Sequence, residues 1–584
     1  MTNLKDIKFL TIDTESDVVG EDPNPWNDKL VLIQYRYNGV GPVTIIEWDK
    51  GERPDELFKA ALADPIIYKR GHYVLYDALV CYVNNIECSG PFDDTRILAY
   101  LEDPFQDVRL KSLVRSKLNR EVKTYEEVTT ILVPSKSKAK KDIGKMVKRK
   151  LSTSQVDRPT LINYATEDVE NCDRIRNIHF DSNWYKTVEQ PLTDIIFRME
   201  KRGMKIDAPH LQILKANHEK EIEDIKTQFP GVNLNSPVQV LELIRGLDAQ
   251  TKNTQGLTIK KLAWGGSSSC VKLLRYRKLS KLLSTYINPI LCGLDGDSRL
   301  HGSFNQAGSD ENSNGTKTGR LTSNGPNLQN IPSRTTEGRE VRRAFVAEDG
   351  NSLFVTDLSQ IEPRLVAHFS QNHKLIKAYK DKQDTHKLMA VDIFEKPEDQ
   401  ITKEERFIGK TEWLADFYGC SAAKAMFIAE NLSENRLPYD LAFYERLHDR
   451  LVAGNPSLFE WRQEHIENTR KLGFIETFGG RQIKIANLNS RNKWDRLAAE
   501  RMAVNYLIQG SAADVLKLIL VKLDRVFQIN SMGFLTGNIH DEVTGELYEP
   551  EDIWAVHSIM TNTVHLKNVD IEAETKIVKS WAEK

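Results

Sequence analysis

Residues 352–364, SLFVTDLSQIEPR, decide the fold of the larger part of this chain of 584 residues. Their apolar run predicts a buried strand that ends in Asp357, and a carboxylate in such a place needs a partner. Residues 534–547, FLTGNIHDEVTGEL, predict a hairpin with Asp541 at its turn. Two carboxylates from these distant segments could share a pair of divalent cations. Taken alone, each aspartate is explained equally well as a capped strand end.

A helix with one functional face is predicted between these two segments. Residues 406–419 read RFIGKTEWLADFYG, and Arg406, Lys410, Leu414 and Tyr418 recur every four positions. Side chains at that spacing lie on one face of a helix. Two cations on one face suit the binding of a triphosphate. A merely solvated basic face would leave the aliphatic and aromatic continuation of the stripe unexplained.

A second stripe follows in the helix predicted over residues 494–527. Arg501, Asn505 and Gln509 lie on one face of a helix that is otherwise rich in apolar residues. Polar groups in such a setting need hydrogen-bond partners. The minor groove of a nucleic-acid duplex offers suitable acceptors and donors.

Carboxylates also mark the N-terminal part, where Asp13 and Glu15 follow the apolar run FLTI. Residues two apart on a strand project to the same face, so the two carboxylates repel each other unless a cation lies between them. A lone D-x-E is more often a surface pair at a strand end. Further acids in this part of the chain strengthen the metal interpretation.

Two more segments of the N-terminal part carry such acids. The sequence GHYVLYD ends in Asp77, after a second apolar stretch. Residues 161–172, LINYATEDVENC, predict a helix capped by Thr160. Tyr164 and Asp168 lie four residues apart and therefore on one face of that helix.

These acids and the tyrosine resemble the set of the proofreading 3′→5′ exonuclease family. The resemblance implies that two Mg²⁺ or Mn²⁺ ions are held by Asp13, Glu15, Asp77 and Asp168. It also implies that Tyr164 orients the attacking water. The sequence departs from the family where His72 is followed by Tyr73, because the family usually has asparagine there. This departure affects a supporting contact to the substrate and not the metal ligands.

The remaining motifs resemble those of family A DNA polymerases, the DNA polymerase I type. Residues 357–364, 406–419 and 540–543 are similar to motifs A, B and C of that family. TGRLTSNGPNLQNIP and ERMAVNYLIQGSAAD are close to two further signatures. The resemblance implies two Mg²⁺ ions on Asp357 and Asp541, with the backbone carbonyl of Leu358 as a further ligand. Glu542 is either a secondary ligand or modulator of this site, or simply a second acid in a turn.

The same resemblance assigns nucleotide and DNA contacts. His386, Arg406 and Lys410 would hold the triphosphate, and Lys410 would belong to the catalytic set. The residues implied around the rest of the nucleotide are Gln360 beside the phosphates, Glu362 against the sugar, Leu414 where relatives usually carry Phe or Tyr, and Tyr418 on the template side. The residues implied along the primer end and minor groove are Arg320, Arg501, Asn505, Gln509 and His540.

The resemblance implies two domains. Residues 1–190 would form an α/β exonuclease domain, a ribonuclease H-like mixed sheet with helices. Residues 191–584 would form an α+β right-hand polymerase domain. Its expected parts are a thumb at about 191–300, a palm at about 301–371 and 500–584, and fingers at about 372–499.

Composition limits the class of protein. Lys+Arg number 81 and Asp+Glu 83, a net charge of −2, so any basic groove must be local. No apolar run approaches the roughly eighteen residues that span a bilayer, and the N-terminus lacks a signal-type core. We therefore expect a cytoplasmic monomer that does not enter a membrane. The basic segment at residues 134–150 is expected to be a mobile loop, more often a solvated face than a binding site.

The expected function is DNA-templated DNA polymerisation with 3′→5′ proofreading. Its partners would be primer–template DNA, dNTPs and, as further candidates, replication accessory proteins. Because the chain begins at the exonuclease segment, we expect no 5′-nuclease domain. A phage or prophage replicase in a bacterial cytoplasm is the preferred source, with a bacterial or organellar one left open. The rival functions are a non-enzymatic DNA-binding scaffold and a repair exonuclease whose C-terminal part only holds DNA.

Overall fold

The N-terminal part is built on a five-stranded mixed sheet in the order β3-β2-β1-β4-β5. The computed structural model describes residues 3–20, 23–134, 146–179, 182–308, 316–333, 335–433 and 436–584. The strands are β1 (Phe9–Asp17), β2 (Lys29–Tyr37), β3 (Thr44–Glu47), β4 (Tyr68–Gly71) and β5 (Phe92–Asp94). Strand β2 runs antiparallel to β1 and β3, whereas β4 runs parallel to β1 and β5. This is the ribonuclease H-like mixed sheet that we expected.

Helices cover this sheet, and the longest of them corrects a capping prediction. They are α1 (Glu56–Ala63), α2 (Val74–Val83), α3 (Thr95–Glu102), α4 (Leu110–Leu118), α5 (Tyr125–Thr129) and α6 (Arg158–Ile178). Helix α6 is capped by Asp157, whose side chain accepts a hydrogen bond from the Thr160 N–H. The prediction of Thr160 as the cap was therefore wrong, because the more N-terminal carboxylate reaches the free N–H groups of the first turn.

A two-stranded hairpin projects from the N-terminal part between α5 and α6. Strands β6 (Thr130–Pro134) and β7 (Met146–Lys150) pair antiparallel. The expected loop over residues 134–150 is thus wrong at its C-terminal end, where β-branched and long side chains pair with β6 instead. Residues 135–145 of that prediction lie outside the described residues.

The second sheet is antiparallel throughout, in the order β15-β16-β12-β17. Its strands are β12 (Ser352–Leu358), β15 (Gly533–Ile539), β16 (Glu542–Leu547) and β17 (Ala573–Val578). Helices α14 (Ile361–Ser370), α21 (Lys493–Asn530) and α22 (Ile553–Asn562) belong to the same part of the chain. Phe354 of β12 is fully buried and packs edge-on against Phe527 of α21. The predicted strand, hairpin and helix are therefore confirmed.

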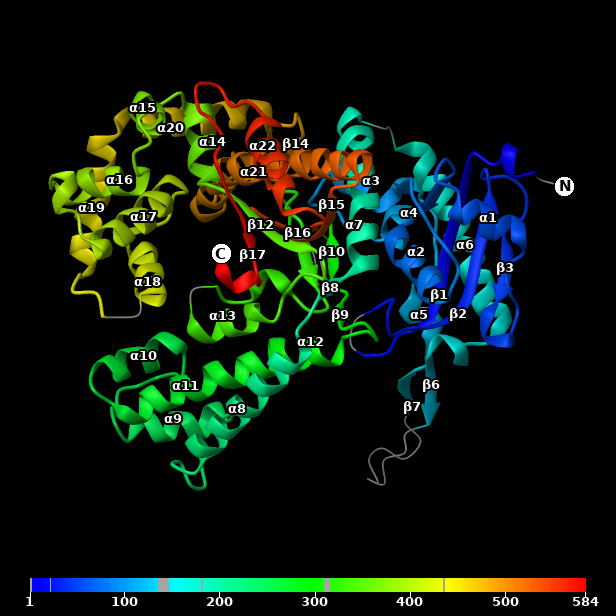
Figure 1. Cartoon of the computed structure of the whole chain (residues 1–584), viewed down its shortest axis with the longest axis horizontal. Helices are drawn as coiled ribbons and strands as arrows, with labels where there is room; N and C mark the ends of the chain where they lie inside the picture. Colours follow the sequence, from blue (N-terminus) through cyan, green and yellow to red (C-terminus); the bar gives the residue numbers. More distant parts are fainter. Residues whose placement is uncertain are drawn as a thin grey trace.

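Two groups of helices face each other across this sheet, as Figure 1 shows. The lower group contains α8 (Ala208–Lys226), α9 (Pro237–Arg245), α10 (Gly256–Trp264), α11 (Ser268–Leu282), α12 (Asn288–Cys292) and α13 (Thr336–Arg343). The group at upper left contains α15 (His373–Lys380), α16 (Thr385–Phe394), α17 (Lys403–Phe417), α18 (Ala422–Leu432), α19 (Leu441–Gly454) and α20 (Pro456–Leu472). The predicted thumb would correspond to the lower group, the predicted fingers to the upper group and the predicted palm to the sheet.

Short strands complete the fold. They are β8 (Met204–Lys205), β9 (Arg299–Leu300), β10 (Ser303–Asn305), β11 (Thr322–Asn324), β13 (Phe474–Glu476) and β14 (Gln482–Lys484). Helix α7 (Gln190–Arg202), placed by sequence at the start of the thumb, packs against α2 and β5 on one side and β15 and α21 on the other. It therefore joins the N-terminal part to the part of the chain that carries the second sheet.

Helix α21 is long and apolar enough to span a membrane by length and composition alone. The apolar window that passes this test has a mean hydropathy of 1.3 and is 72% buried inside the protein. Such burial is what the core helix of a folded domain shows. The same helix continues without a break across residue 500, where we placed the limit between fingers and palm.

A buried ion pair connects α21 to the C-terminal end of the N-terminal part. Lys517 donates to Glu189 at 2.7 Å, and both side chains are almost fully buried. Glu189 also accepts hydrogen bonds from Trp184 and Gln306. Both oxygens of the Glu189 carboxylate therefore accept hydrogen bonds, which offsets the cost of burying its charge.

We predict that Lys517→Met destabilises the protein by about 3–5 kcal/mol, because it leaves the Glu189 charge buried without its cation. Chemical denaturation monitored by circular dichroism measures this change. The matched control is Lys522→Met, an exposed lysine on the same helix. Equal stability of the two variants would contradict the structural role of the pair.

Candidate active sites

The first candidate site lies at the carboxyl half of β1. Asp13 and Glu15 project from β1, and Asp168 approaches from α6. One carboxylate oxygen from each of the three lies within 4.8 Å of the others. The predicted four-residue spacing on α6 is confirmed, because it places Tyr164 on the same side of the helix as Asp168. Three oxygen donors at this separation fit a hard divalent cation.

Burial makes the charges of this cluster costly. Burial and then the nearby charge of Asp168 raise the pKa of Asp13 to about 7, although a hydrogen bond from Gln34 opposes the shift. Burial and the charge of Asp13 likewise raise the pKa of Glu15 well above its usual value. A divalent cation would relieve this repulsion. The residues present therefore fit a metal.

Asp77 and Tyr73 take positions that sequence reasoning did not anticipate. Asp77 is buried on α2, and one of its oxygens accepts hydrogen bonds from the N–H of Thr14 at 2.9 Å and its hydroxyl at 2.7 Å. Asp77 is not among the three acids that form the cluster. The hydroxyl of Tyr73 donates to Asn305 of β10 at 3.0 Å. Tyr73 thus contacts the palm side rather than the acids.

The second candidate site lies where β12 ends beside the β15–β16 turn. Pairing of β12 with β16 sets Asp357 opposite Glu542, and the N–H of Leu358 donates to the carbonyl of Asp541 at 3.2 Å. His540 adopts a φ of +57° in this turn. Burial raises the pKa of Asp541 to about 6, while the positive charge of Arg320 opposes the shift. The structure thus brings together the two aspartates that the sequence singled out.

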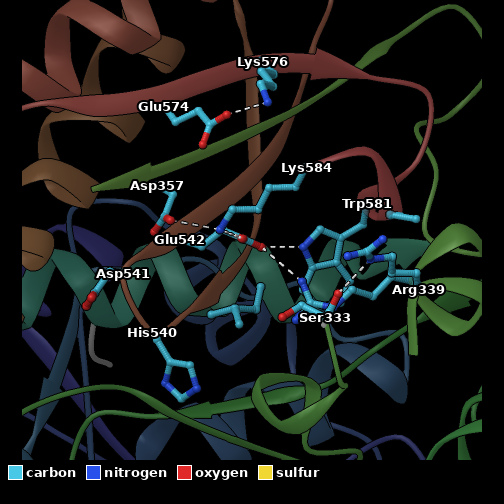
Figure 2. A pocket seen from close by; sticks show the side chains of 13 residues that line it. Ser333, Arg339, Asp357, His540, Asp541, Glu542, Glu574, Lys576, Trp581 and Lys584 are labelled. Atoms are coloured by element: carbon cyan, nitrogen blue, oxygen red, sulfur yellow. Dashed lines mark hydrogen bonds and ion pairs between the residues drawn. The ribbon is translucent and has the colours of Figure 1, made fainter. Parts of the chain in front are cut away.

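Glu542 is buried behind these aspartates. One of its oxygens accepts a hydrogen bond from the Trp581 indole and the other from the Lys584 ammonium. The same ammonium is 3.0 Å from an oxygen of Asp357. Figure 2 shows these residues around a cavity of 530 Å³. Glu542 therefore holds the segment that carries Trp581 and Lys584 beside Asp357.

The face of α17 that the sequence predicted is present beside this site. Arg406 donates to Asp384 at 2.5 Å. His386 is buried and accepts a hydrogen bond from the Trp413 indole at 3.2 Å. Burial and the neighbouring charge of Lys410 lower the pKa of His386 to about 4. His386 is therefore neutral at physiological pH, and the cations of this face are Arg406 and Lys410.

The residues expected around the sugar form one hydrogen-bonded group. Glu362 accepts from Arg320 with one oxygen and from the Tyr418 hydroxyl with the other, each at 2.5 Å. Arg364, two residues further along α14, pairs with Glu572 and not with Glu362. Leu414 is half-buried, and the buried Trp413 and Phe417 point into the core. Leu414 therefore shares the face of Lys410 and Tyr418.

The other residues predicted to contact the nucleotide or DNA lie at the start of α14 and on α21. Gln360 has a φ of +55° and accepts a hydrogen bond from the Thr385 hydroxyl at 2.5 Å. On α21, Arg501 is exposed, while Asn505 and Gln509 are half-buried. The amide oxygen of Asn505 is buried without a hydrogen-bond partner among the described residues. Such a group calls for a ligand or water.

Comparison with known proteins identifies the family. The family model described as "DNA polymerase family A" matches residues 208–583, and one described as "3'-5' exonuclease" matches residues 1–179. The chain belongs to DNA polymerase family A. Its N-terminal part is a 3′→5′ exonuclease domain of the type that accompanies this polymerase family. Family A polymerases and their exonuclease domains are metal-dependent, which agrees with the acid clusters described above.

Several relatives cover much of the chain. DNA polymerase I of Borreliella burgdorferi is 28% identical over all of this chain and 63% of its own length. The thermostable DNA polymerase I of Thermus thermophilus is 33% identical over 68% of this chain and 48% of its own length. The chain thus spans about half to two thirds of these relatives. A Pol1 polymerase domain from M. smegmatis, solved with DNA primer-template and dNTP, has a TM-score of 0.76 and 25% identity over 98% of this chain and 95% of that chain.

Sequence reasoning missed a lysine in each site of this polymerase. Lys111 of α4 donates to Asp168, and its ammonium lies 4.0 Å from the centre of the Tyr164 ring. Lys584 pairs with Asp357 and Glu542. Neither lysine stands at a helical or strand spacing from the acids it contacts, so no local signal could have found it. Each ammonium partly neutralises acids that would otherwise repel.

The core-facing side of α17 holds another unexpected pair. Glu412 and Asp416 are buried, and neither oxygen of Glu412 has a hydrogen-bond partner among the described residues. His448 lies 3.0 Å from Asp416. Burial and the charge of Asp416 raise the pKa of Glu412 to about 8. Helix α17 therefore carries a destabilising carboxylate, Glu412, on its inner face.

We predict that Lys111→Met lowers the metal concentration needed for half-maximal exonuclease activity about fivefold. The lysine competes with the metal for Asp168, and removing its charge removes about 1 kcal/mol of repulsion. Titration of the activity with Mn²⁺ measures the change. Lys111→Arg should behave like the natural protein, and Lys117→Met, on the same helix, is the control. A higher metal requirement in Lys111→Met would contradict this competition.

We predict that Glu412→Leu stabilises the fingers more at high pH than at low pH. Because its folded-state pKa is raised, the stability contributed by protonated Glu412 is fully present below the unfolded pKa near 4.5 and is lost as the pH rises through about 8. The gain should reach on the order of 2 kcal/mol at about pH 9. Thermal unfolding at about pH 6 and about pH 9 tests this, with the exposed Glu445→Leu as the control. A gain that does not depend on pH would contradict it.

Proposed function

We propose that this chain is a DNA-templated DNA polymerase that extends a primer 3′-OH with dNTPs and removes mismatched 3′ ends with a separate exonuclease site. The observation that carries the proposal is the presence of two acid sets on two different sheets. Each set has acids on a strand of its sheet and contacts its own lysine. The proposal includes a cytoplasmic monomer that acts on primer–template DNA with replication accessory proteins.

The metals proposed for both sites are Mg²⁺ ions, with Mn²⁺ as a substitute. Asp357, Asp541 and the carbonyl of Leu358 would hold two in the polymerase site. The acids that would hold two in the exonuclease site are Asp13, Glu15, Asp77 and Asp168. When bound, such ions lower the pKa of the attacking oxygen and stabilise the leaving oxygen. The oxygen-only donor sets suit hard cations of this kind.

The fingers face of α17 would position the incoming nucleotide. Arg406 and Lys410 supply fixed positive charge for the triphosphate, and Asp384 sets the direction of the Arg406 side chain. His386 remains neutral and can accept or donate one hydrogen bond. Since phosphoryl transfer depends mainly on positioning and electrostatics, these groups would act by aligning the α-phosphate with the primer 3′-OH.

Glu362 would exclude ribonucleotides and Tyr418 would border the template side. Hydrogen bonds from Arg320 and Tyr418 hold both oxygens of Glu362, so its side chain has little freedom to move aside. A fixed carboxylate against the sugar leaves no space for a 2′-OH. Leu414 offers the sugar an aliphatic surface with no hydrogen-bond donor.

The DNA contacts would follow α21 and the β15–β16 turn. Arg501, Asn505 and Gln509 form an exposed-to-half-buried row that suits minor-groove acceptors. His540 and Arg320 lie beside Asp541, where the primer end would be placed. In the exonuclease site, Tyr164 would orient the attacking water, and Lys111 fixes the ring from one face.

We predict that the two activities separate. Asp357→Ala or Asp541→Ala should reduce primer extension at least a thousandfold and leave degradation of single strands intact, because each acid set serves one reaction. Asp13→Ala combined with Glu15→Ala should do the reverse. Primer extension and 3′-end degradation on labelled oligonucleotides measure both. Loss of both activities from one folded variant would contradict the two-site proposal.

We predict that Glu362→Ala raises the incorporation of ribonucleotides relative to deoxyribonucleotides by at least tenfold, because the side chain no longer occupies the space of the 2′-OH. Tyr418→Phe, which frees one oxygen of Glu362, should raise the ratio by a smaller factor. Single-nucleotide insertion kinetics with matched dNTP and rNTP give the ratio. An unchanged ratio in Glu362→Ala would remove this assignment.

A further inference from the structure

The β6–β7 hairpin is a two-stranded ribbon with exposed apolar side chains. It projects from the exonuclease domain beyond α5, and Figure 1 shows it standing apart from the sheets. Leu132 is 62% exposed and Met146 is 54% exposed. An isolated two-stranded hairpin is marginally stable in water, and exposed apolar residues that cluster mark a binding surface. The ribbon therefore has the features of a surface that binds a partner.

The same ribbon is cationic. Strand β7 contains Lys148, Arg149 and Lys150, all exposed, and the described residues of β6 and β7 include no acid. In the antiparallel register Lys148 stands opposite Leu132. Cross-strand partners share a face, so cationic and apolar side chains lie next to each other. This combination fits a partner that is both anionic and apolar.

The base of the hairpin lies beside the exonuclease acids. The Thr153 hydroxyl donates to the carbonyl of Ser16 at 2.7 Å, and Ser16 directly follows Glu15 on β1. Tyr125 of α5 is hydrogen-bonded to Thr153 at 2.8 Å, and the Lys150 ammonium lies 5.9 Å from the centre of the Tyr125 ring. The hairpin thus leaves the domain at the end of β1 that carries the catalytic acids.

A cavity beside α5, the helix that directly precedes β6, reaches Tyr164. Its volume is 270 Å³, and it lies between Val128 of α5 and Tyr164 of α6. Its other lining residues are Lys123, Pro159, Thr160, Asn163 and Glu167, and none of them belongs to β6 or β7. A strand that lies along the ribbon could therefore reach the tyrosine proposed to orient the attacking water.

We propose that the β6–β7 hairpin guides single-stranded DNA into the exonuclease site. Unpaired bases would lie on the exposed apolar side chains, and backbone phosphates would pair with Lys148, Arg149 and Lys150. Double-stranded DNA, whose bases are stacked inside, would offer nothing to the apolar residues. The inference rests on the proposed exonuclease function and adds to it the path of the substrate.

The experiment compares two exonuclease substrates in the full-length protein: a single strand of about 20 nucleotides and the dinucleotide pdTpdT, which is too short to reach the ribbon. The first variant combines Lys148→Gln, Arg149→Gln and Lys150→Gln. The second combines Leu132→Ser with Met146→Ser. The matched control combines Lys5→Gln, Lys50→Gln and Lys59→Gln, three exposed lysines elsewhere on the same domain.

Both hairpin variants should lower kcat/KM on the long strand about tenfold and leave pdTpdT hydrolysis unchanged, while the control changes neither. In the first variant, the slope of log KM against log salt concentration should also fall by about 2, because three contacts to phosphates are lost. Unchanged hydrolysis of naked single strands by the hairpin variants would overturn the inference and point to a protein partner. Equal losses on both substrates would also overturn it. If the natural protein hydrolyses neither substrate, the proposed exonuclease function itself is overturned.

Discussion

The electrostatic cost of gathering carboxylates at the ends of buried strands governs both sites of this polymerase. Burial raises the pKa of Asp13 to about 7 and that of Asp541 to about 6, so neither group is easily charged without a nearby cation. Lys111 and Lys584 supply such cations. The acids are thus held in place by the chain itself, and a metal would have to displace or share these ammonium groups.

The same constraint explains the surroundings of the polymerase acids. Glu542 could have added a third repelling charge, but Trp581 and Lys584 use both of its oxygens. Glu362 is likewise fully used by Arg320 and Tyr418. Glu542 and Glu362, the acids near Asp541, therefore each accept hydrogen bonds from donors of the chain. What remains open to a substrate is the cavity beside Asp357 and Asp541 in Figure 2.

Away from the two sites, buried carboxylates differ in how fully they are hydrogen-bonded, as Glu189 and Glu412 of α17 show. Glu189 is satisfied by Lys517 and two neutral donors, and it joins the exonuclease domain to the palm. Glu412 lacks a partner for either oxygen among the described residues. A helix with fixed cations outside and an unsatisfied acid inside is held less firmly than a helix with an apolar inner face.

The sequence by itself determined the strands that carry Asp13 and Asp357, the hairpin with Asp541 and the helices that carry Asp168 and Lys410. These features follow from periods of two or four residues, which are visible without a fold. Only the tertiary structure decided that Lys111 contacts Asp168, that Asp77 binds Thr14 and that the basic segment pairs partly as a hairpin. The reason is physical: the lysine and Asp77 contacts join residues more than fifty positions apart, and hairpin pairing depends on register between strands. No local period records such relations, because they arise when separate elements pack together.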